Sequence, residues 1–483
     1  MTSSSAPSVR PELPASPRHV HLTAIAGVGM ASLAGMLRAA GYDVTGSDQA
    51  IYPPMSDVLA SLGIAVREGY RPENLEPRPD LVIVGNAMSR GNLEVEAMLA
   101  AGIPYCSMPE ALMRFFMQSR RRAVVVGTHG KTTTSAMLSW VLHETGGDPS
   151  FMVGGASRNF PQNFRLGSGP WFVAEGDEYD TAFFDKGPKF LHYDPDALLL
   201  NAIEFDHADI YRDLDHVKSA FRTLLERLRT TAVLAACADF PEVRNVVAAS
   251  GREAVLFGNG PGAAWRAEAV RDDGTATRFT VVGPGVRRDA MLPLPGAINV
   301  ANAIGVVTLT HLMGVPLDGV IAALATFKGV KRRQEVIAEG RGITVIDDFA
   351  HHPTAVAGTL AALRGRYPGR RIWALFEPRS NTTRRKVFQD AFADAFAAAD
   401  RVTFGGVHRR DQLPEAERLS VDDVIASLRA RGRAAESAED PDAIAALVAD
   451  QVAPGDVVVM MSNGGFGGLG GKLLTALGLP AAS

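Results

Sequence analysis

Residues 122–134 combine the residue types that bind the phosphates of a nucleotide. They read Arg-Ala-Val-Val-Val-Gly-Thr-His-Gly-Lys-Thr-Thr-Thr, an apolar run followed by a glycine turn and a helix-compatible segment. Glycines let backbone N–H groups approach an anion, a helix N-terminus adds a favourable dipole, and lysine brings charge to the outer phosphates. Val125 replaces the first glycine of the longer G-x-x-x-x-G-K-[ST] motif. A plain glycine turn is the alternative, but every part of a phosphate loop occurs here in order.

Carboxylate and histidine side chains follow the apolar strands predicted after this loop. The strands cover residues 171–174, 197–200 and 232–237, and they lead to Glu175, to Asp206 and His207, and to Asp239. In an open α/β sheet, ligands bind beyond the carboxyl ends of the strands, so these groups should converge on the loop. We therefore predict a magnesium–nucleotide site, with oxygen ligands from Thr132 and Glu175. His207 is an unusual magnesium ligand, and pairing with a neighbouring carboxylate is the alternative for it.

A second glycine turn lies between residues 20 and 48. An apolar strand leads into Gly27-Val-Gly-Met, a helical pattern follows, and the next strand ends at Ser47 and Asp48. The spacing is close to the dinucleotide fingerprint, with Ser32 in place of the third glycine and Asp48 near the position of a ribose-binding acid. Alone, this pattern leaves NAD or FAD, another nucleotide and purely structural glycines open.

Length and composition indicate a folded protein with several domains. The chain has 483 residues, of which 46% are hydrophobic and 21% charged, so it is too long for one core and suggests roughly three domains. The 49 Lys and Arg residues against 53 Asp and Glu give a net charge of −4. This balance does not favour binding of nucleic acid or of an anionic membrane.

Cysteine content and hydropathy indicate a cytoplasmic protein. Cys106 and Cys237 are the only cysteines, so a disulfide framework is excluded, and both are expected to be buried. No apolar run approaches the ~20 residues of a membrane-spanning helix. Residues 1–17 are rich in Ser and Pro, lack the hydrophobic region of a signal peptide and are expected to be a disordered tail.

The order of motifs predicts three α/β domains after the tail, at residues 18–119, 120–330 and 331–483. The first boundary falls at the basic run 120–122, which we expect to be solvated surface. Residues 265–281 alternate in polarity and suggest a hairpin appended to the middle sheet. The third α/β unit is expected to begin near residue 343, with strands at 372–376, 402–404 and 457–461.

Taken together, these motifs resemble the Mur ligase family. The matching segments, in order and spacing, are residues 27–30 with 46–48, 127–132, 175, 206–207, 302, 331–333 and 347–353. The resemblance runs from about Val20 to the C-terminus. It implies an α/β fold with the three domains of the family: a Rossmann-like UDP-binding domain, a central P-loop ATPase-like domain and a C-terminal Rossmann-like domain.

The resemblance also implies a reaction. The N-terminal glycine turn is similar to those that hold the UDP of UDP-N-acetylmuramate, which disfavours a dinucleotide. Five segments, 175–186, 190–193, 204–210, 377–381 and 462–467, resemble the branch that joins the tripeptide L-alanyl-γ-D-glutamyl-meso-diaminopimelate to this sugar in murein recycling. ATP, with Mg²⁺, phosphorylates the lactyl carboxylate in this family, and the amine of the tripeptide attacks the resulting acyl phosphate.

The resemblance assigns roles to individual residues. Lys131, Glu175 and His207 are the expected catalytic residues, and Thr132, Glu175 and His207 are the expected metal ligands. ATP is expected to contact Gly127, Thr128, His129, Gly130, Lys131, Thr132, Thr133, Asn302, Arg333, Asp347 and His351. UDP-N-acetylmuramate is expected to contact Gly27, Val28, Gly29, Met30, Ser47, Asp48, Asn86 and Ser89. The tripeptide is expected to contact Arg379, Ser380, Asn381, Ser462 and Asn463.

Two positions depart from the family pattern, and three other functions stay open. The carbamoylated lysine of several Mur ligases has no counterpart in residues 220–222, and Ile298 stands where histidine is usual. A UDP-N-acetylmuramate–L-alanine ligase would share every nucleotide and metal motif. An NAD-dependent oxidoreductase would leave Glu175 without a role, and a non-catalytic UDP-sugar-binding protein would not need Lys131. The sequence does not predict the oligomeric state or the strictness for the peptide.

Overall fold

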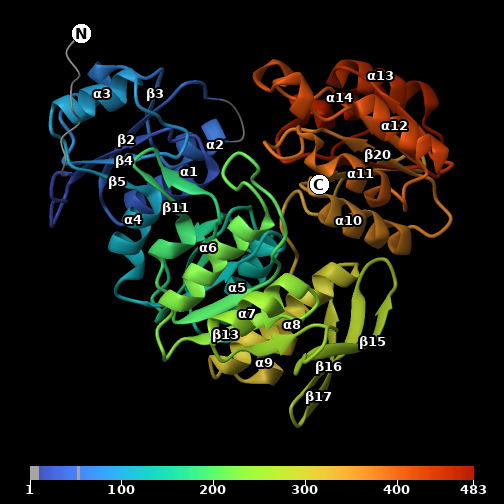
Figure 1. Cartoon of the computed structure of the whole chain (residues 1–483), viewed down its shortest axis with the longest axis horizontal. Coiled ribbons are helices and arrows are strands. Elements are labelled where there is room, and N and C mark those ends of the chain that lie inside the picture. The colour runs from blue at the N-terminus through green and yellow to red at the C-terminus, as the bar shows by residue number, and fades with distance from the viewer. Residues whose placement is uncertain (1–9, 52–54, 483) are drawn as a thin grey trace.

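Three large sheets follow one another along the chain (Figure 1). The computed structural model describes residues 10–51 and 55–482. The N-terminal unit is blue, the central unit green to yellow and the C-terminal unit orange to red, and the central unit lies between the other two along the chain. The predicted α/β class with parallel sheets is confirmed. The sheets are built from residues 19–107, 121–257 and 335–461, within the three predicted segments, and the domain bounds themselves stay a prediction.

The N-terminal sheet is entirely parallel, in the order β3-β2-β1-β4-β5. Its strands are β1 (His19–Thr23), β2 (Asp43–Asp48), β3 (Val66–Glu68), β4 (Leu81–Val84) and β5 (Tyr105–Ser107). Its helices are α1 (Val28–Ala39), α2 (Met55–Ser61), α3 (Leu93–Ala100) and α4 (Met108–Leu112). Gly46 in β2 must be glycine, because a Cβ there would lie 2.8 Å from the carbonyl oxygen of Leu22.

The central sheet has the order β14-β13-β12-β6-β9-β7-β8. Its strands are β6 (Arg121–Val126), β7 (Ser150–Met152), β8 (Phe164–Arg165), β9 (Trp171–Gly176), β12 (Ala197–Leu200), β13 (Val233–Cys237) and β14 (Val255–Phe257). Its helices are α5 (Lys131–Glu144), α6 (Leu214–Arg227), α7 (Pro241–Ser250), α8 (Ala297–Leu312) and α9 (Leu317–Leu324). Parallel β9 and β12 flank β6, so the ends of these three strands meet at one edge. Valines 124–126 of β6 are fully buried, as expected for a strand covered on both faces.

Two predictions for the central unit are only partly right. The expected hairpin is present, because β15 (Arg266–Asp272) pairs antiparallel with β16 (Thr277–Gly283), but with β17 (Val286–Leu292) it forms a sheet separate from the central one. Its apolar side chains, such as Phe279, pack into the same core as α8. The basic run is only partly solvated, because Arg122 is 4% exposed and its Nε donates to Asp196 Oδ2 at 3.0 Å.

The C-terminal sheet has the order β18-β19-β23-β20-β21-β22. Its strands are β18 (Glu335–Gly340), β19 (Ile343–Asp348), β20 (Ile372–Phe376), β21 (Arg401–Phe404), β22 (Ala434–Ser437) and β23 (Val457–Met461). Its helices are α10 (Pro353–Arg366), α11 (Gln389–Ala395), α12 (Val421–Ala430), α13 (Pro441–Gln451) and α14 (Leu469–Leu477). The three predicted strands are confirmed. The sheet begins earlier than expected, because β18 pairs antiparallel with β19.

Three further expectations concern the cysteines, the tail and the membrane. Cys106 and Cys237 are both buried, as predicted. Residues 1–9 of the predicted tail lie outside the described residues, whereas the Arg10 guanidinium donates two 3.0 Å hydrogen bonds to Glu110. Within residues 10–51 and 55–482, no helix has both the length and the apolar character needed to cross a membrane.

Candidate active site

The glycine turn between β6 and α5 has the geometry expected of a phosphate-binding loop. Gly127 and Gly130 both have positive φ values, 132° and 79°, and a Cβ at Gly127 would lie 2.7 Å from the backbone nitrogen of Ala202. Helix α5 begins at Lys131, so its free N–H groups face the loop. Lys131 Nζ donates 2.7 Å hydrogen bonds to Gly127 O and to Glu178 Oε2. The predicted order of strand, loop and helix is therefore confirmed.

Glu178 joins Lys131 and His207, two of the predicted catalytic residues. Its carboxylate is 2% exposed and also lies 3.2 Å from His207 Nε2. Burial alone would raise the pKa of Glu178, but the charge of Lys131 and the hydrogen bond from His207 hold it at about 2. Burial would likewise lower the pKa of His207, but Glu178 raises it to about 9. The three side chains thus form a cation–anion–cation group at neutral pH, in which the anion is buried and the two cations are partly buried.

Sequence reasoning missed Glu178. The only signal was its place just after β9, three residues beyond Glu175, among several acids that the pattern could not rank. His207 has the carboxylate pairing that was left open above, and its contact is with Glu178. To bind a metal, His207 has to lose its proton and leave this pairing.

Glu175 and Thr132 fit a hard cation. Glu175 Oε2 accepts from Gly154 N at 2.8 Å, whereas its Oε1 is buried and has no hydrogen-bond partner among the described residues. Burial, followed by the charge of Asp177, raises the pKa of Glu175 to about 7, and a hydrogen bond from Thr132 opposes the shift. A buried carboxylate with an unpaired oxygen beside a hydroxyl matches the oxygen ligands that Mg²⁺ prefers.

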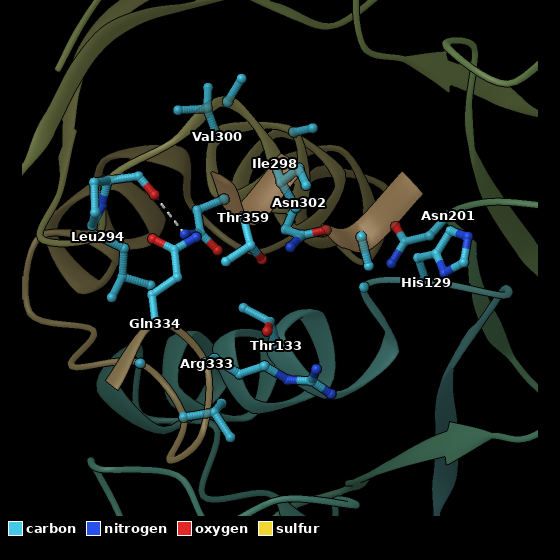
Figure 2. A pocket seen from close by; sticks show the side chains of 18 of the residues that line it. His129, Thr133, Asn201, Leu294, Ile298, Val300, Asn302, Arg333, Gln334 and Thr359 are labelled. Atoms are coloured by element: carbon cyan, nitrogen blue, oxygen red, sulfur yellow. Dashed lines mark hydrogen bonds between the residues drawn. The ribbon is translucent and has the colours of Figure 1, made fainter. Parts of the chain in front are cut away.

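A cavity of about 520 Å³ lies beside the loop, between the central and C-terminal units. Figure 2 shows Thr133 and Asn302 on opposite sides of this space, with His129 and Asn201 at one end and Leu294 and Gln334 at the other. Its size suits a nucleotide base and sugar. The predicted ATP contacts that line it are His129, Gly130, Thr133, Asn302 and Arg333.

Other predicted ATP contacts lie outside the lining of this cavity. The Asp347 carboxylate accepts from Arg332 Nε at 3.0 Å, and His351 Nε2 lies 3.8 Å from Asp206 Oδ2. Arg333 lines the cavity and also reaches the start of α5, because its Nη2 lies 3.5 Å from Thr132 Oγ1. Ile298 lines the cavity and is 40% exposed, so an apolar side chain occupies the position where the family pattern has histidine.

In the N-terminal unit, the glycine turn and the exposed Asn86 and Ser89 follow the adjacent strands β1 and β4. Gly27, Val28, Gly29 and Met30 lie at the start of α1, where N–H groups are free for an anion. Ser47 is fully buried, however, and its hydroxyl donates to Glu94 Oε1 at 2.6 Å. Asp48 accepts from the backbone nitrogen of Ala26 at 2.9 Å. Asp48 therefore supports the turn through its side chain, whereas Ser47 supports it through its backbone oxygen, which accepts from Ile25 N at 3.1 Å.

The predicted peptide contacts lie at the carboxyl ends of the neighbouring strands β20 and β23. Glu377, which was not predicted, accepts from Ser462 Oγ and lies 3.4 Å from Arg379 Nη1. Asn381 Nδ2 donates to Asp209 Oδ2 of the central unit at 2.7 Å. The remaining predicted contacts are Ser380, whose hydroxyl bonds to Thr383 at 3.0 Å, and Asn463, whose Oδ1 is buried without a partner in the described chain.

The fold is that of an ATP-dependent ligase with three domains, and family comparisons agree. Residues 19–120 match the catalytic domain of the Mur ligase family, residues 125–310 the Mur ligase middle domain, and residues 332–464 the Mur ligase glutamate ligase domain. The chain belongs to the Mur ligase family.

Similar proteins within the family include ligases for two different acceptors. The chain is 40% identical over 463 residues to the UDP-N-acetylmuramate–L-alanyl-γ-D-glutamyl-meso-2,6-diaminoheptandioate ligase of Escherichia coli (strain K12), covering 95% of this chain and 98% of that protein. It is 34% identical to the UDP-N-acetylmuramate–L-alanine ligase of Aromatoleum aromaticum, covering 95% and 98%. The crystal structure of a murein peptide ligase from Psychrobacter arcticus matches with a TM-score of 0.73 and 36% identity, covering 96% of this chain and all of that one.

Proposed function

We propose that this protein is an ATP-dependent ligase that joins the tripeptide L-alanyl-γ-D-glutamyl-meso-diaminopimelate to UDP-N-acetylmuramate. The observation that carries the proposal is 40% identity along nearly the whole of a relative with this specificity, against 34% for an L-alanine ligase. The product is an amide, and the other products are ADP and phosphate. The reaction returns recovered wall peptide to peptidoglycan synthesis.

The central unit supplies groups suited to phosphoryl transfer from ATP to the lactyl carboxylate. Lys131 and the free N–H groups of the loop would stabilise charge on the transferred phosphoryl group. Thr132 and Glu175, with His207 after it loses its proton, would hold Mg²⁺, which supplies further neutralisation of phosphate charge. Glu178 would hold Lys131 and His207 in place before nucleotide binds. The cavity beside Asn302 would receive the nucleoside.

The outer units would supply the other two substrates. We assign UDP-N-acetylmuramate to the N-terminal turn at Gly27–Met30 and to Asn86 and Ser89, with Ser47 and Asp48 acting through the turn that they support. We assign the tripeptide to Arg379, Ser380, Asn381, Ser462 and Asn463, whose polar groups suit carboxylates and an amine. We also propose that the three domains cover residues 18–119, 120–330 and 331–483. The proposed location is the cytoplasm, where ATP and UDP-sugars occur.

Phosphate release by the purified protein tests this proposal. The reaction contains ATP, Mg²⁺ and UDP-N-acetylmuramate, and the acceptor is either the tripeptide or L-alanine. We expect turnover with the tripeptide and none above background with L-alanine. Turnover with L-alanine alone would move the protein to the L-alanine ligases and leave the ATP site unchanged. No turnover with either acceptor would favour a non-catalytic protein that binds UDP-sugar.

A further inference from the structure

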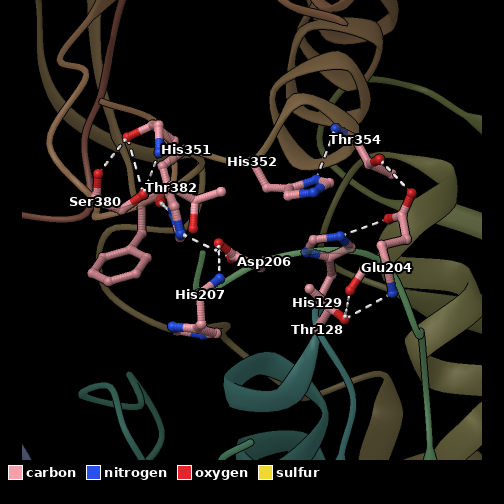
Figure 3. A network of polar contacts seen from close by, with 12 residues as sticks. Thr128, His129, Glu204, Asp206, His207, His351, His352, Thr354, Ser380 and Thr382 are labelled. Atoms are coloured by element: carbon pink, nitrogen blue, oxygen red, sulfur yellow. Dashed lines mark hydrogen bonds and ion pairs between the residues drawn. The ribbon is translucent and has the colours of Figure 1, made fainter. Parts of the chain in front are cut away.

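Glu204 contacts the phosphate loop and the C-terminal unit at the same time (Figure 3). One carboxylate oxygen, Oε2, lies 2.6 Å from His129 Nε2, in the loop. The other, Oε1, accepts from Thr354 Oγ1 at 2.9 Å, in the first turn of α10. These partners lie 75 residues before and 150 residues after Glu204 in the chain.

Further contacts strengthen both sides of this connection. On the loop side, Glu204 N donates to Thr128 Oγ1 at 3.0 Å, so Glu204 holds two consecutive loop residues, directly before Gly130. On the other side, the ring of His352 lies 4.3 Å from the ring of His129, and its Nε2 lies 3.2 Å from Phe205 O. Figure 3 shows the two rings facing each other, with Glu204 beside them.

His352 has the properties of a neutral hydrogen-bonding group. It is 5% exposed, and burial, followed by the electrostatic effect of the neighbouring His129, lowers its pKa to about 4. A neutral imidazole donates through one nitrogen and accepts through the other. Accordingly, Nε2 can donate to Phe205 O while Nδ1 accepts from the backbone nitrogen of Thr354 at 3.3 Å.

We propose that Glu204 is a positioning residue that transmits docking of the C-terminal unit to the phosphate loop. When α10 docks, Thr354 holds Oε1 of Glu204 and His352 packs against His129, while Glu204 in turn fixes Thr128 and His129. These residues immediately precede the glycine and lysine that face the phosphates, so the loop reaches its working geometry only when the two units are together. This inference rests on the proposed ligase function.

A transition-metal site is the other chemistry that these residues could support. Ligand atoms of His129, Glu204 and His352 all lie within 4.8 Å of one another. However, both oxygens of Glu204 and both ring nitrogens of His352 already have hydrogen-bond partners. A metal would have to displace several of these contacts, and the hydrogen-bonded connection accounts for the arrangement without it.

The test removes the Thr354 hydroxyl alone. Thr354→Val keeps the shape of the side chain, and Thr354→Ser keeps the hydroxyl and is the matched control. We expect the valine variant to lower kcat/KM for ATP about tenfold, the effect of losing one hydrogen bond to a charged group. The serine variant should stay within about twofold of the wild type. Equal values for the valine variant and the wild type would overturn the proposal.

Because Thr354 also lines the nucleotide cavity, a double-mutant cycle separates an action through Glu204 from direct contact with ATP. In the background of Glu204→Ala, Thr354→Val should cause no further loss. A further tenfold loss there would mean direct contact and would overturn the proposal. Tight binding of Zn²⁺ to the wild type, lost in Glu204→Ala, would overturn it in favour of a metal site.

The same variants keep the two proposals distinguishable. If the wild type turns over with neither acceptor, the proposed function fails, and the Kd for ATP, measured by calorimetry, still reports on the loop. We then expect Thr354→Val to bind ATP about tenfold more weakly than Thr354→Ser. Equal affinities would overturn the proposal that Glu204 transmits docking to the loop. Thermal unfolding of each variant shows whether any loss follows from misfolding.

Discussion

Glu178 in the central unit and Glu94 in the N-terminal unit are both buried carboxylates, but they hold different kinds of partner. Glu178 pairs with Lys131 and His207, two cationic groups that the proposed reaction uses. Glu94, which is fully buried, accepts from His21 Nε2 at 2.9 Å, from Ser47 Oγ at 2.6 Å and from Asn74 Nδ2 at 2.6 Å.

This difference indicates that the two carboxylates have different functions. Glu178 holds side chains that later bind substrate or metal, whereas Glu94 stabilises the fold. The partners of Glu178 are groups that can turn to a phosphate or a metal, so these contacts have to be broken during the reaction. The partners of Glu94 lie on strands β1 and β2 and before β4, and their hydrogen bonds tie these segments to α3. Substitutions around Glu178 should therefore change activity first, and substitutions at Glu94 should change stability first.

Removal of the charge at Lys131 should have the largest effect. We expect Lys131→Ala to lower kcat about 10³-fold, because no other group at the loop can stabilise the transferred phosphoryl group in the same way. The measurement is phosphate release with saturating ATP and tripeptide. A kcat within tenfold of the wild type would show that Lys131 is not part of the phosphate site.

Neutralising Glu178 should have a smaller effect on the same assay. Glu178→Gln keeps the shape but weakens the hold on Lys131 and His207, and loss of such supporting contacts typically costs about 10- to 100-fold in activity. Titration of Mg²⁺ in the assay should show whether the loss lies in metal affinity or in kcat. An unchanged kcat and an unchanged Mg²⁺ requirement would contradict the proposal that Glu178 holds Lys131 and His207 until they bind phosphate or metal.

Glu94→Gln should act mainly on stability. The amide would present a donor to groups that already donate, and loss of charged hydrogen bonds in a buried site costs about 2 kcal/mol. The midpoint of thermal unfolding should fall by a few degrees. The matched control is Glu96→Gln on the same helix, whose 39% exposed side chain pairs with Arg90 at the surface, and it should change stability by less than about 0.5 kcal/mol.

The stability difference at Glu94 should depend on pH. Burial would raise its pKa, but the hydrogen bonds from His21, Ser47 and Asn74 outweigh burial and lower it in the folded protein. A lowered folded-state pKa adds stability above the ordinary carboxylate pKa of 4.5, and this contribution is lost as the pH falls through the folded-state value. The gap in unfolding temperature between wild type and Glu94→Gln should therefore narrow below about pH 4. A constant gap from pH 7 to pH 3 would contradict this account.

Local patterns predicted the parts of the site that depend on neighbours in the chain. Strand, glycines and helix N-terminus around Lys131 lie within a dozen residues, and the order of apolar strands placed Glu175 and His207 at the right edge. The unpredicted contacts join distant positions. Lys131 and Glu178 are 47 residues apart, and Glu204 and Thr354 are 150 apart.

Other features that the local patterns did not reveal have the same origin. Arg122 is buried because Asp196, 74 residues later, meets it on the neighbouring strand, which no local charge pattern reveals. Ser47 is a predicted UDP-N-acetylmuramate contact, and its local sequence does not reveal that its hydroxyl turns inward to Glu94, which comes 47 residues later. The predicted hairpin lies outside the central sheet because β17 extends it at one edge and its apolar side chains pack into the same core as α8.

The most direct test of the proposed specificity is a competition between the two acceptors. The wild-type protein receives ATP, Mg²⁺ and UDP-N-acetylmuramate with equal concentrations of the tripeptide and L-alanine, and mass spectrometry quantifies both amide products. The ligase proposed here should yield the tripeptide product in at least a hundredfold excess, which is about 2.7 kcal/mol of discrimination. Predominance of the L-alanine product would contradict the proposed substrate.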